Sequence, residues 1–169
     1  MFKNKSHKYN LYNTLLILSR NIFFYKKVGL SDTFETRIYL MFFHFSIMMI
    51  IFKIKKVRFD QKEYDSLFDN IEYNLRELGF GDVSVNKKMK DLNKVLYDIL
   101  LKLKIDNQTI FKINKKLVFK YFKEFQASND ENYEFFEKYL LNFYNFCFEL
   151  SLDNIIKDSI KFKFNYGST

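Results

Sequence analysis

Two glycines separated by one residue, Gly79 and Gly81, stand between two segments of helical periodicity. The chain has only four glycines and no proline, so few positions can interrupt a helix. The spacing predicts a helical hairpin, and the scarcity of helix breakers favours an all-α fold. The apolar residues recur mostly every three or four positions, as on one face of an α-helix; they are Tyr64, Leu67, Phe68, Ile71, Leu75 and Leu78, then Val85, Met89, Leu92, Leu96, Ile99 and Leu103.

The residues around the glycines predict how the first helix ends and the second begins. Gly79 stands where a terminal residue with left-handed backbone is expected, and Phe80 can then contact Leu75, as in a Schellman motif. Asp82 or Ser84 can accept hydrogen bonds from the free N–H groups of the next helix. This account is structural and requires no function.

A run of 15 mostly apolar residues, 38–52, is interrupted only by His44 and Ser46. A membrane-spanning helix needs about 20 apolar residues, so we expect a buried central helix here. Asp32 as its N-cap would place Glu35 at the third helical position, a spacing typical of a capping box. The predicted helix therefore begins at Ser31 or Asp32 and extends to about residue 53.

The remaining segments complete an all-α prediction: a single compact domain, residues 1–169, of about six to seven helices around the apolar second helix. We expect residues 1–7 and 163–169 to be loose tails. Residues 160–166 alternate apolar and polar side chains, but one short segment cannot form a sheet alone. The other predicted helices cover residues 8–25, 106–125 and 131–150, with a short helix capped by Asp153.

The net charge of +8 is unevenly distributed. Only four of the 28 basic residues are arginines, so the excess of lysine fits either codon bias or a functional surface. Acidic residues line the outer face of the first hairpin helix, and Lys87, Lys90 and Lys94 line one face of the second. These faces either neutralise each other, are solvated, or attract a charged partner.

Residues that could support catalysis are few. Cys147 has no second cysteine for a disulfide or zinc site, which favours a reducing compartment. His44 lies in an apolar segment without a second ligand at metal spacing, so we expect a hydrogen-bonded histidine of the core or of an interface. The glycine pair follows a helix rather than the strand of a phosphate-binding loop. We therefore expect no catalytic residue, no metal and no cofactor.

Several blocks in one order carry a resemblance to a known family. They are Phe24-Tyr25, Gly29, Asp32, Glu35, Arg37 and His44, then residues 65–71, then residues 75–83 followed by Val85 and residues 87–90. Together, over residues 11–103, the chain resembles the ubiquinol–cytochrome c reductase assembly chaperone family. One element departs from the family pattern: Tyr97 is present, but the Gly-Arg that often follows it is replaced by Asp98 and Ile99.

The resemblance implies a non-catalytic, all-helical factor that binds cytochrome b during assembly of the cytochrome bc1 complex. It also implies other contacts: a small helper protein, the ribosome or an anionic membrane surface, but no specific DNA site. The location would be the cytoplasm with peripheral membrane association, or the matrix side in mitochondria. The signature and partner-binding candidates are Tyr25, Asp32, Arg37, His44, Arg76, Glu77, Gly79, Gly81, Asp82, Lys87, Lys88, Lys90 and Tyr97.

Further expectations concern what these residues do. Arg37 or Arg76 could bond Asp32 or Asp82 and fix the helix ends. Aromatic and methionine residues of the central helix could form an apolar surface for a membrane-protein client, or pack in the core; the candidates are Phe42, Phe43, Met48 and Met49. Two other functions fit the sequence: a basic membrane- or RNA-binding module without a cytochrome b client, and a small helical enzyme dependent on His44.

Overall fold

The computed structural model describes residues 10–103, 111–127 and 129–167. Within these residues every regular element is a helix, which confirms the predicted all-α fold. The α-helices are α1 (Leu11–Ser19), α2 (Ile22–Lys26), α3 (Phe34–Ile54), α4 (Gln61–Glu77), α5 (Asp82–Lys102), α6 (Lys115–Tyr121), α7 (Glu124–Ala127), α8 (Asp130–Phe148) and α9 (Ile155–Asp158), and two 3-10 helices span Leu152–Asn154 and Ser159–Lys161.

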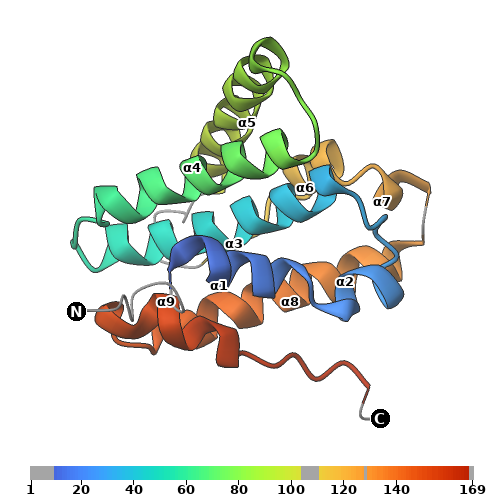
Figure 1. The fold of residues 1–169 in the computed structure, drawn as a ribbon. Coiled ribbons are helices and arrows are strands. Elements are labelled where there is room, and N and C mark those ends of the chain that lie inside the picture. Colours follow the sequence, from blue (N-terminus) through green and yellow to red (C-terminus); the bar gives the residue numbers. More distant parts are fainter. Residues whose placement is uncertain (1–9, 104–110, 128, 168–169) are drawn as a thin grey trace.

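Helix α3 is the centre of the fold, as predicted (Figure 1). It packs against α1, α5 and α8, and buried residues occur on all its sides. By length and hydropathy it could also cross a membrane, but most of its apolar window is buried against other helices. An apolar side chain stabilises a fold by about 1.5–3 kcal/mol when it leaves water, so α3 dominates the core.

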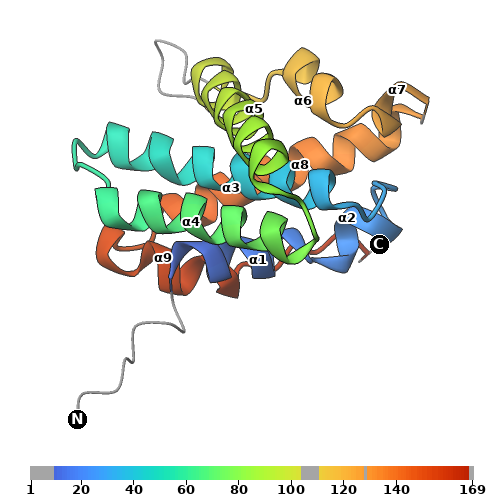
Figure 2. The same ribbon diagram turned by 45° about the horizontal axis from the view of Figure 1, so that its top comes forward.

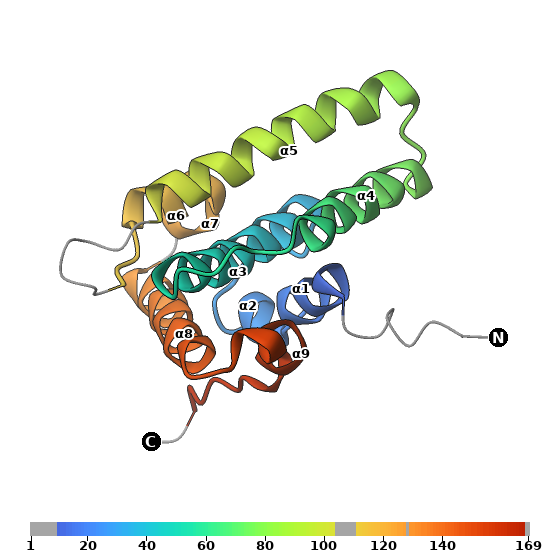
Figure 3. The ribbon, with the colours of Figure 1, turned by 90° about the vertical axis from the view of Figure 1, so that its left-hand side faces the viewer.

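The helices lie in layers around α3, with α5 along one edge of the molecule (Figures 2 and 3). Helices α4 and α5 form the predicted hairpin, and α4 also packs on α1. Helix α8 lies on the other side of α3, and α9 packs against α1. One face of α5 is therefore left uncovered by the described helices.

Helix α8 is tied to the end of α3 by a polar contact. Lys55, the C-cap of α3, donates hydrogen bonds from Nζ to the carbonyl oxygens of Phe148 (2.6 Å) and Leu150 (3.3 Å). These carbonyls belong to the last turn of α8 and the residues after it, where no intrahelical donor is available. The ammonium group also suits the negative end of the helix dipole.

Two predicted helices are divided or shortened. The helix expected over residues 8–25 is α1 and α2, because Asn21 caps a new helix by accepting from the Phe23 N–H (3.1 Å). The helix expected over 106–125 is wrong in extent: α6 begins after Asn114, which caps it through the Leu117 N–H (3.2 Å). In both cases the asparagine competes for backbone N–H groups and sets a new start. Residues 104–110 lie outside the described structure.

The C-terminal tail is held by aromatic contacts. Residues 162–167 have no regular secondary structure, yet Phe164 and Tyr166 both pack on Phe23, with ring centroids 5.1 and 4.7 Å away. These ring contacts place Phe164 and Tyr166 against α2, although Tyr166 is still 41% exposed. The loose tail over residues 163–169 stays a prediction. Residues 168–169, and the predicted tail at 1–7, lie outside the described structure.

Candidate functional site

The turn between α4 and α5 has the predicted Schellman geometry. Gly79 has a φ of +95°, which is unfavourable for residues with a Cβ atom. The Gly79 N–H donates to the Arg76 carbonyl (3.0 Å), and the Phe80 N–H donates to the Leu75 carbonyl (3.3 Å). This pair of bonds satisfies carbonyls that the end of α4 leaves free, and it reverses the chain direction.

Arg76 spans this turn. Its guanidinium donates to Asp82 of α5 and to Glu72 Oε1 of α4 (3.0 Å). The prediction that Arg76 bonds Asp82 is thus confirmed. The hydrogen bonds that Arg76 donates to Asp82 and Glu72 raise the pKa of Arg76. The prediction that Asp82 or Ser84 caps α5 is wrong: Gly81 is the N-cap residue, no side chain bonds there, and Asp82 is the first helical residue.

The hairpin tip, defined as residues 78–83, exposes three apolar side chains. The exposed fraction is 60% for Leu78, 37% for Phe80 and 85% for Val83. Leu78 was expected on the buried face of its helix, and this is wrong because it is the C-cap residue, where the helical path ends. Phe80 and Val83 lie outside the apolar repeats of the two helices, so periodicity does not indicate their exposure.

The signature lysines after the turn differ in their surroundings. Lys87 and Lys90 are exposed, whereas Lys88 is partly buried and places its Nζ 4.7 Å from the centre of the Phe80 ring. That distance allows a cation–π contact between α5 and the turn. Glu77, at the end of α4, is exposed. Within the described residues Lys87, Lys90 and Lys94 form no ion pair with the acidic side of α4, so the two faces do not neutralise each other.

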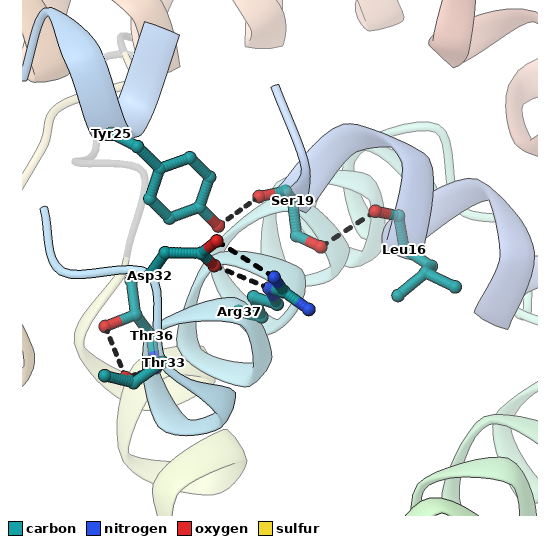
Figure 4. Close-up of polar contacts among 7 residues, drawn as sticks. All are labelled: Leu16, Ser19, Tyr25, Asp32, Thr33, Thr36 and Arg37. Atoms are coloured by element: carbon teal, nitrogen blue, oxygen red, sulfur yellow. Dashed lines mark hydrogen bonds and ion pairs between the residues drawn. The ribbon is translucent and has the colours of Figure 1, made fainter. Parts of the chain in front are cut away.

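A second polar cluster joins α1, α2 and α3 (Figure 4). Arg37 makes a bidentate ion pair with Asp32, from Nε to Oδ1 (2.7 Å) and from Nη2 to Oδ2 (3.0 Å). Tyr25 donates its hydroxyl hydrogen to the Ser19 carbonyl (2.6 Å). The predicted bond between Arg37 and Asp32 is confirmed, but Asp32 does not cap α3: Thr33 does, by accepting from the Thr36 N–H (3.2 Å).

Electrostatics in this cluster follow from the ion pair. The hydrogen bond from Arg37 lowers the pKa of Asp32, and the same bond raises the pKa of Arg37. Burial and then the charge of Asp32 raise the pKa of Tyr25. At neutral pH, Asp32 is therefore negative, Arg37 is positive and Tyr25 is neutral. The ion pair fixes the connection that precedes α3.

His44 is fully buried and both ring nitrogens have partners. Nδ1 lies 2.6 Å from the Leu40 carbonyl and Nε2 lies 2.9 Å from the Tyr139 hydroxyl. A carbonyl only accepts, so Nδ1 carries the hydrogen and Nε2 accepts from Tyr139. Burial lowers the pKa of His44 to about 4. The imidazole is thus a neutral core group between α3 and α8, away from any exposed partner surface.

Tyr97 lies on the outside of α5 and is 57% exposed. The next residue, Asp98, accepts from Lys102 (2.6 Å), Lys120 (2.7 Å) and the Tyr121 hydroxyl. Partial burial opposes ionisation of Asp98, but these hydrogen bonds outweigh it and hold the pKa of the carboxyl well below its usual range. Asp98 therefore joins α5 to α6, a role that sequence spacing does not predict because its two partners beyond α5, Lys120 and Tyr121, lie over 20 residues away.

The apolar candidates of α3 belong to the core. Phe42, Phe43 and Met48 are fully buried, and Met49 is partly buried. Cys147 is buried too, and its pKa is raised by burial to about 12, which keeps it a protonated thiol. Among the described residues, no three His, Cys, Asp or Glu side chains gather as a metal site would require. The exposed signature residues thus fall into two clusters, the α4–α5 hairpin and the α2–α3 connection.

Most of the residues in these two clusters lie in a segment of the chain that is similar to a known family. A family model described as Ubiquinol-cytochrome C chaperone matches residues 26–107, just under half of the chain. No curated protein and no solved structure is similar enough to the chain to count as a match. The matched segment contains the Asp32–Arg37 pair, all of α3 and the whole hairpin. Over these residues the chain resembles the ubiquinol–cytochrome c reductase assembly chaperone family.

Proposed function

We propose that this protein is a non-catalytic assembly factor that binds cytochrome b during biogenesis of the cytochrome bc1 complex. The observation that carries the proposal is the family match over residues 26–107. The buried and fully bonded His44, together with the protonated Cys147, supports a role without catalysis. A holding role would place the protein at the membrane where its client is inserted.

We further propose that the hairpin tip contacts the client. It combines exposed apolar side chains with signature residues, and a chaperone for a membrane protein needs apolar surface that a client can cover. Arg76 and the Gly79 turn fix the backbone of the tip, so Leu78 and Phe80 are held outward and binding costs less conformational entropy. The Asp32–Arg37 ion pair stabilises the start of α3.

The test is co-purification of cytochrome b from gently solubilised membranes with the tagged protein. We expect retention well above an unrelated basic control protein. Leu78→Ser with Phe80→Ser should reduce retained cytochrome b at least tenfold, because the apolar contact is lost. Ile17→Ser with Ile22→Ser removes two similarly exposed apolar side chains from α1 and α2 and should leave retention unchanged.

A second pair of variants separates folding from binding. Arg76→Ala with Lys88→Ala should loosen the tip and reduce retention while the far-UV circular dichroism spectrum stays that of the wild type. Arg76→Ala and Asp82→Ala should each lower the melting midpoint slightly at low salt. If the midpoints do not change, the ion pair has no structural role and Arg76 faces the client directly. Retention of no cytochrome b by the folded wild type would refute the proposed function.

A further inference from the structure

Helix α5 presents a line of exposed side chains directly opposite its buried face. The buried residues are Val85, Leu92, Leu96 and Ile99. The exposed ones recur every three or four positions, so they share one side of the helix. This outer stripe of α5 consists of Val83, Lys87, Lys90, Lys94, Tyr97 and Leu101.

The three lysines of the outer stripe have no acidic partner within the described residues. The stripe itself contains no Asp or Glu, and Asp91, which flanks it, forms no ion pair there. Like charges at these helical spacings destabilise a helix by a few tenths of a kcal/mol per pair. The like charges of the three lysines therefore do not stabilise the helix, and an anionic partner would relieve their repulsion.

Helix α6 extends the same basic edge. Lys116 and Lys120 of α6 and Lys123, which follows it, are exposed, and Lys120 reaches Asp98 of α5 (2.7 Å). Asp98 is also bonded by Lys102, so this one carboxylate is shared between two lysines and adds no free negative charge. Helix α5 lies along the outer edge of the molecule (Figure 3), and the exposed lysines of α5 and of the α6 segment make this region strongly positive.

The apolar residues of the outer stripe favour a lipid bilayer over a nucleic acid as the anionic partner. Val83 is 85% exposed at one end and Leu101 is 65% exposed at the other, with Tyr97 beside it. Aliphatic side chains contribute little to a phosphate-lined nucleic acid groove, and the stripe has no arginine to form bidentate bonds with phosphate or to stack on bases. In the headgroup region of a bilayer, aliphatic groups insert, tyrosine is favoured, and lysines reach lipid phosphates.

We propose that the outer stripe of α5 is a docking surface for an anionic lipid bilayer, with the helix lying flat along about 27 Å of membrane. Val83 and Leu101 insert at either end, and Lys87, Lys90 and Lys94 bind the headgroups. The proposal rests on the proposed function, because it holds the chaperone where a membrane-protein client is made. It adds the surface that faces the lipid.

The test is co-sedimentation of the full chain with vesicles of phosphatidylcholine alone or with 30% phosphatidylglycerol added. We expect binding only to the anionic vesicles, and weaker binding as NaCl rises from 0.1 to 0.5 M. Lys87→Gln/Lys90→Gln/Lys94→Gln should weaken binding about 100-fold, since each lysine near an anionic surface contributes about a factor of five. Leu101→Ser should weaken it several-fold even in 0.5 M NaCl.

The matched control is Lys26→Gln/Lys62→Gln/Lys138→Gln, which removes the same charge from exposed positions on α2, α4 and α8. Equal losses for the two triple variants would overturn the proposal, since net charge alone would then drive binding. Polyuridylate that binds more tightly than vesicles, with no effect of Leu101→Ser, would overturn it in favour of RNA. Retention of cytochrome b by the stripe variant in detergent measures the proposed function separately, because no bilayer is present there.

Discussion

At the scale of single residues, the two arginines of the signature are the clearest success of sequence reasoning. A guanidinium five or six residues from a carboxylate, across a helix end, can reach it with two parallel donors. The Arg37–Asp32 and Arg76–Asp82 pairs both form. The N-cap residues are harder to predict, because Asp32 and Asp82 are as suitable by residue type as their neighbours Thr33 and Gly81. Both carboxylates bind arginines instead, which leaves Thr33 and Gly81 at the N-cap positions.

The residue type of His44 suggests a binding site, but the structure places this side chain in the core. A histidine in a signature block is a natural candidate for a partner surface, yet here it is a bonded core residue. Its partner Tyr139 is 95 positions away in the chain, so no local pattern indicated the pair. The apolar residues on both sides of His44 were the signal that favoured a core position.

The buried imidazole predicts a pH-dependent stability. The pKa of His44 is about 4 in the folded chain, against about 6.5 when unfolded. The unfolded state therefore binds the proton more readily, and stability that is complete above pH 6.5 falls as the pH drops towards 4. We expect the free energy of unfolding in urea to fall by about 2 kcal/mol from pH 7 to pH 5 on this account.

His44→Gln is the variant that isolates this effect. It should lower stability at pH 7 but remove most of the loss between pH 7 and pH 5. Asp98 does not interfere, because its depressed pKa affects stability only near and below the ordinary aspartate value. An unchanged pH dependence in His44→Gln would show that another group titrates.

At the scale of elements, the α4–α5 hairpin was predictable because two signals agree there. Apolar residues repeat with helical spacing on both sides, and a glycine supplies the left-handed residue between them. The start of α6 was not predictable to the same degree, since aromatic and lysine residues continue the helical spacing through residues 106–125 and Asn114 alone marks the start.

The two glycines of the turn should respond oppositely to one substitution. Gly79→Ser should lower the free energy of unfolding by about 1–2 kcal/mol, because serine is strained at a φ of +95° although its Cβ meets nothing. Gly81→Ser should raise it by a few tenths of a kcal/mol, because serine can cap α5 and reduces the entropy of the unfolded chain. Urea unfolding measures both. A cost at Gly81 equal to that at Gly79 would contradict the assigned turn.

At the scale of the whole molecule, the family match and the folding unit do not coincide. The segment 26–107 contains α3, but α1 lies before it and α8 after it, and both pack on α3. The sequence indicated that α3 is central without indicating which helices cover it. Packing partners depend on contacts between distant residues, such as Phe24 with Tyr139, whose ring centroids are 4.7 Å apart.

A fragment consisting of residues 26–107 should therefore not fold cooperatively. Its α3 would expose side chains that α1 and α8 bury, and each exposed large apolar side chain costs about 1.5–3 kcal/mol. Circular dichroism at 222 nm during urea titration should show a broad, non-cooperative change for the fragment and a sigmoidal transition for the full chain. A sigmoidal transition at the same urea concentration for both would refute this expectation.

The 95 positions between His44 and Tyr139 also determine how long α3 waits for this partner during synthesis. A ribosome adds about 5–20 residues per second, so His44 is synthesised about 5–20 seconds before its partner Tyr139. For that interval a helix apolar enough to span a bilayer has only part of its cover. During synthesis the chain therefore exposes an apolar helix that can aggregate or enter a membrane, as an unassembled membrane protein does.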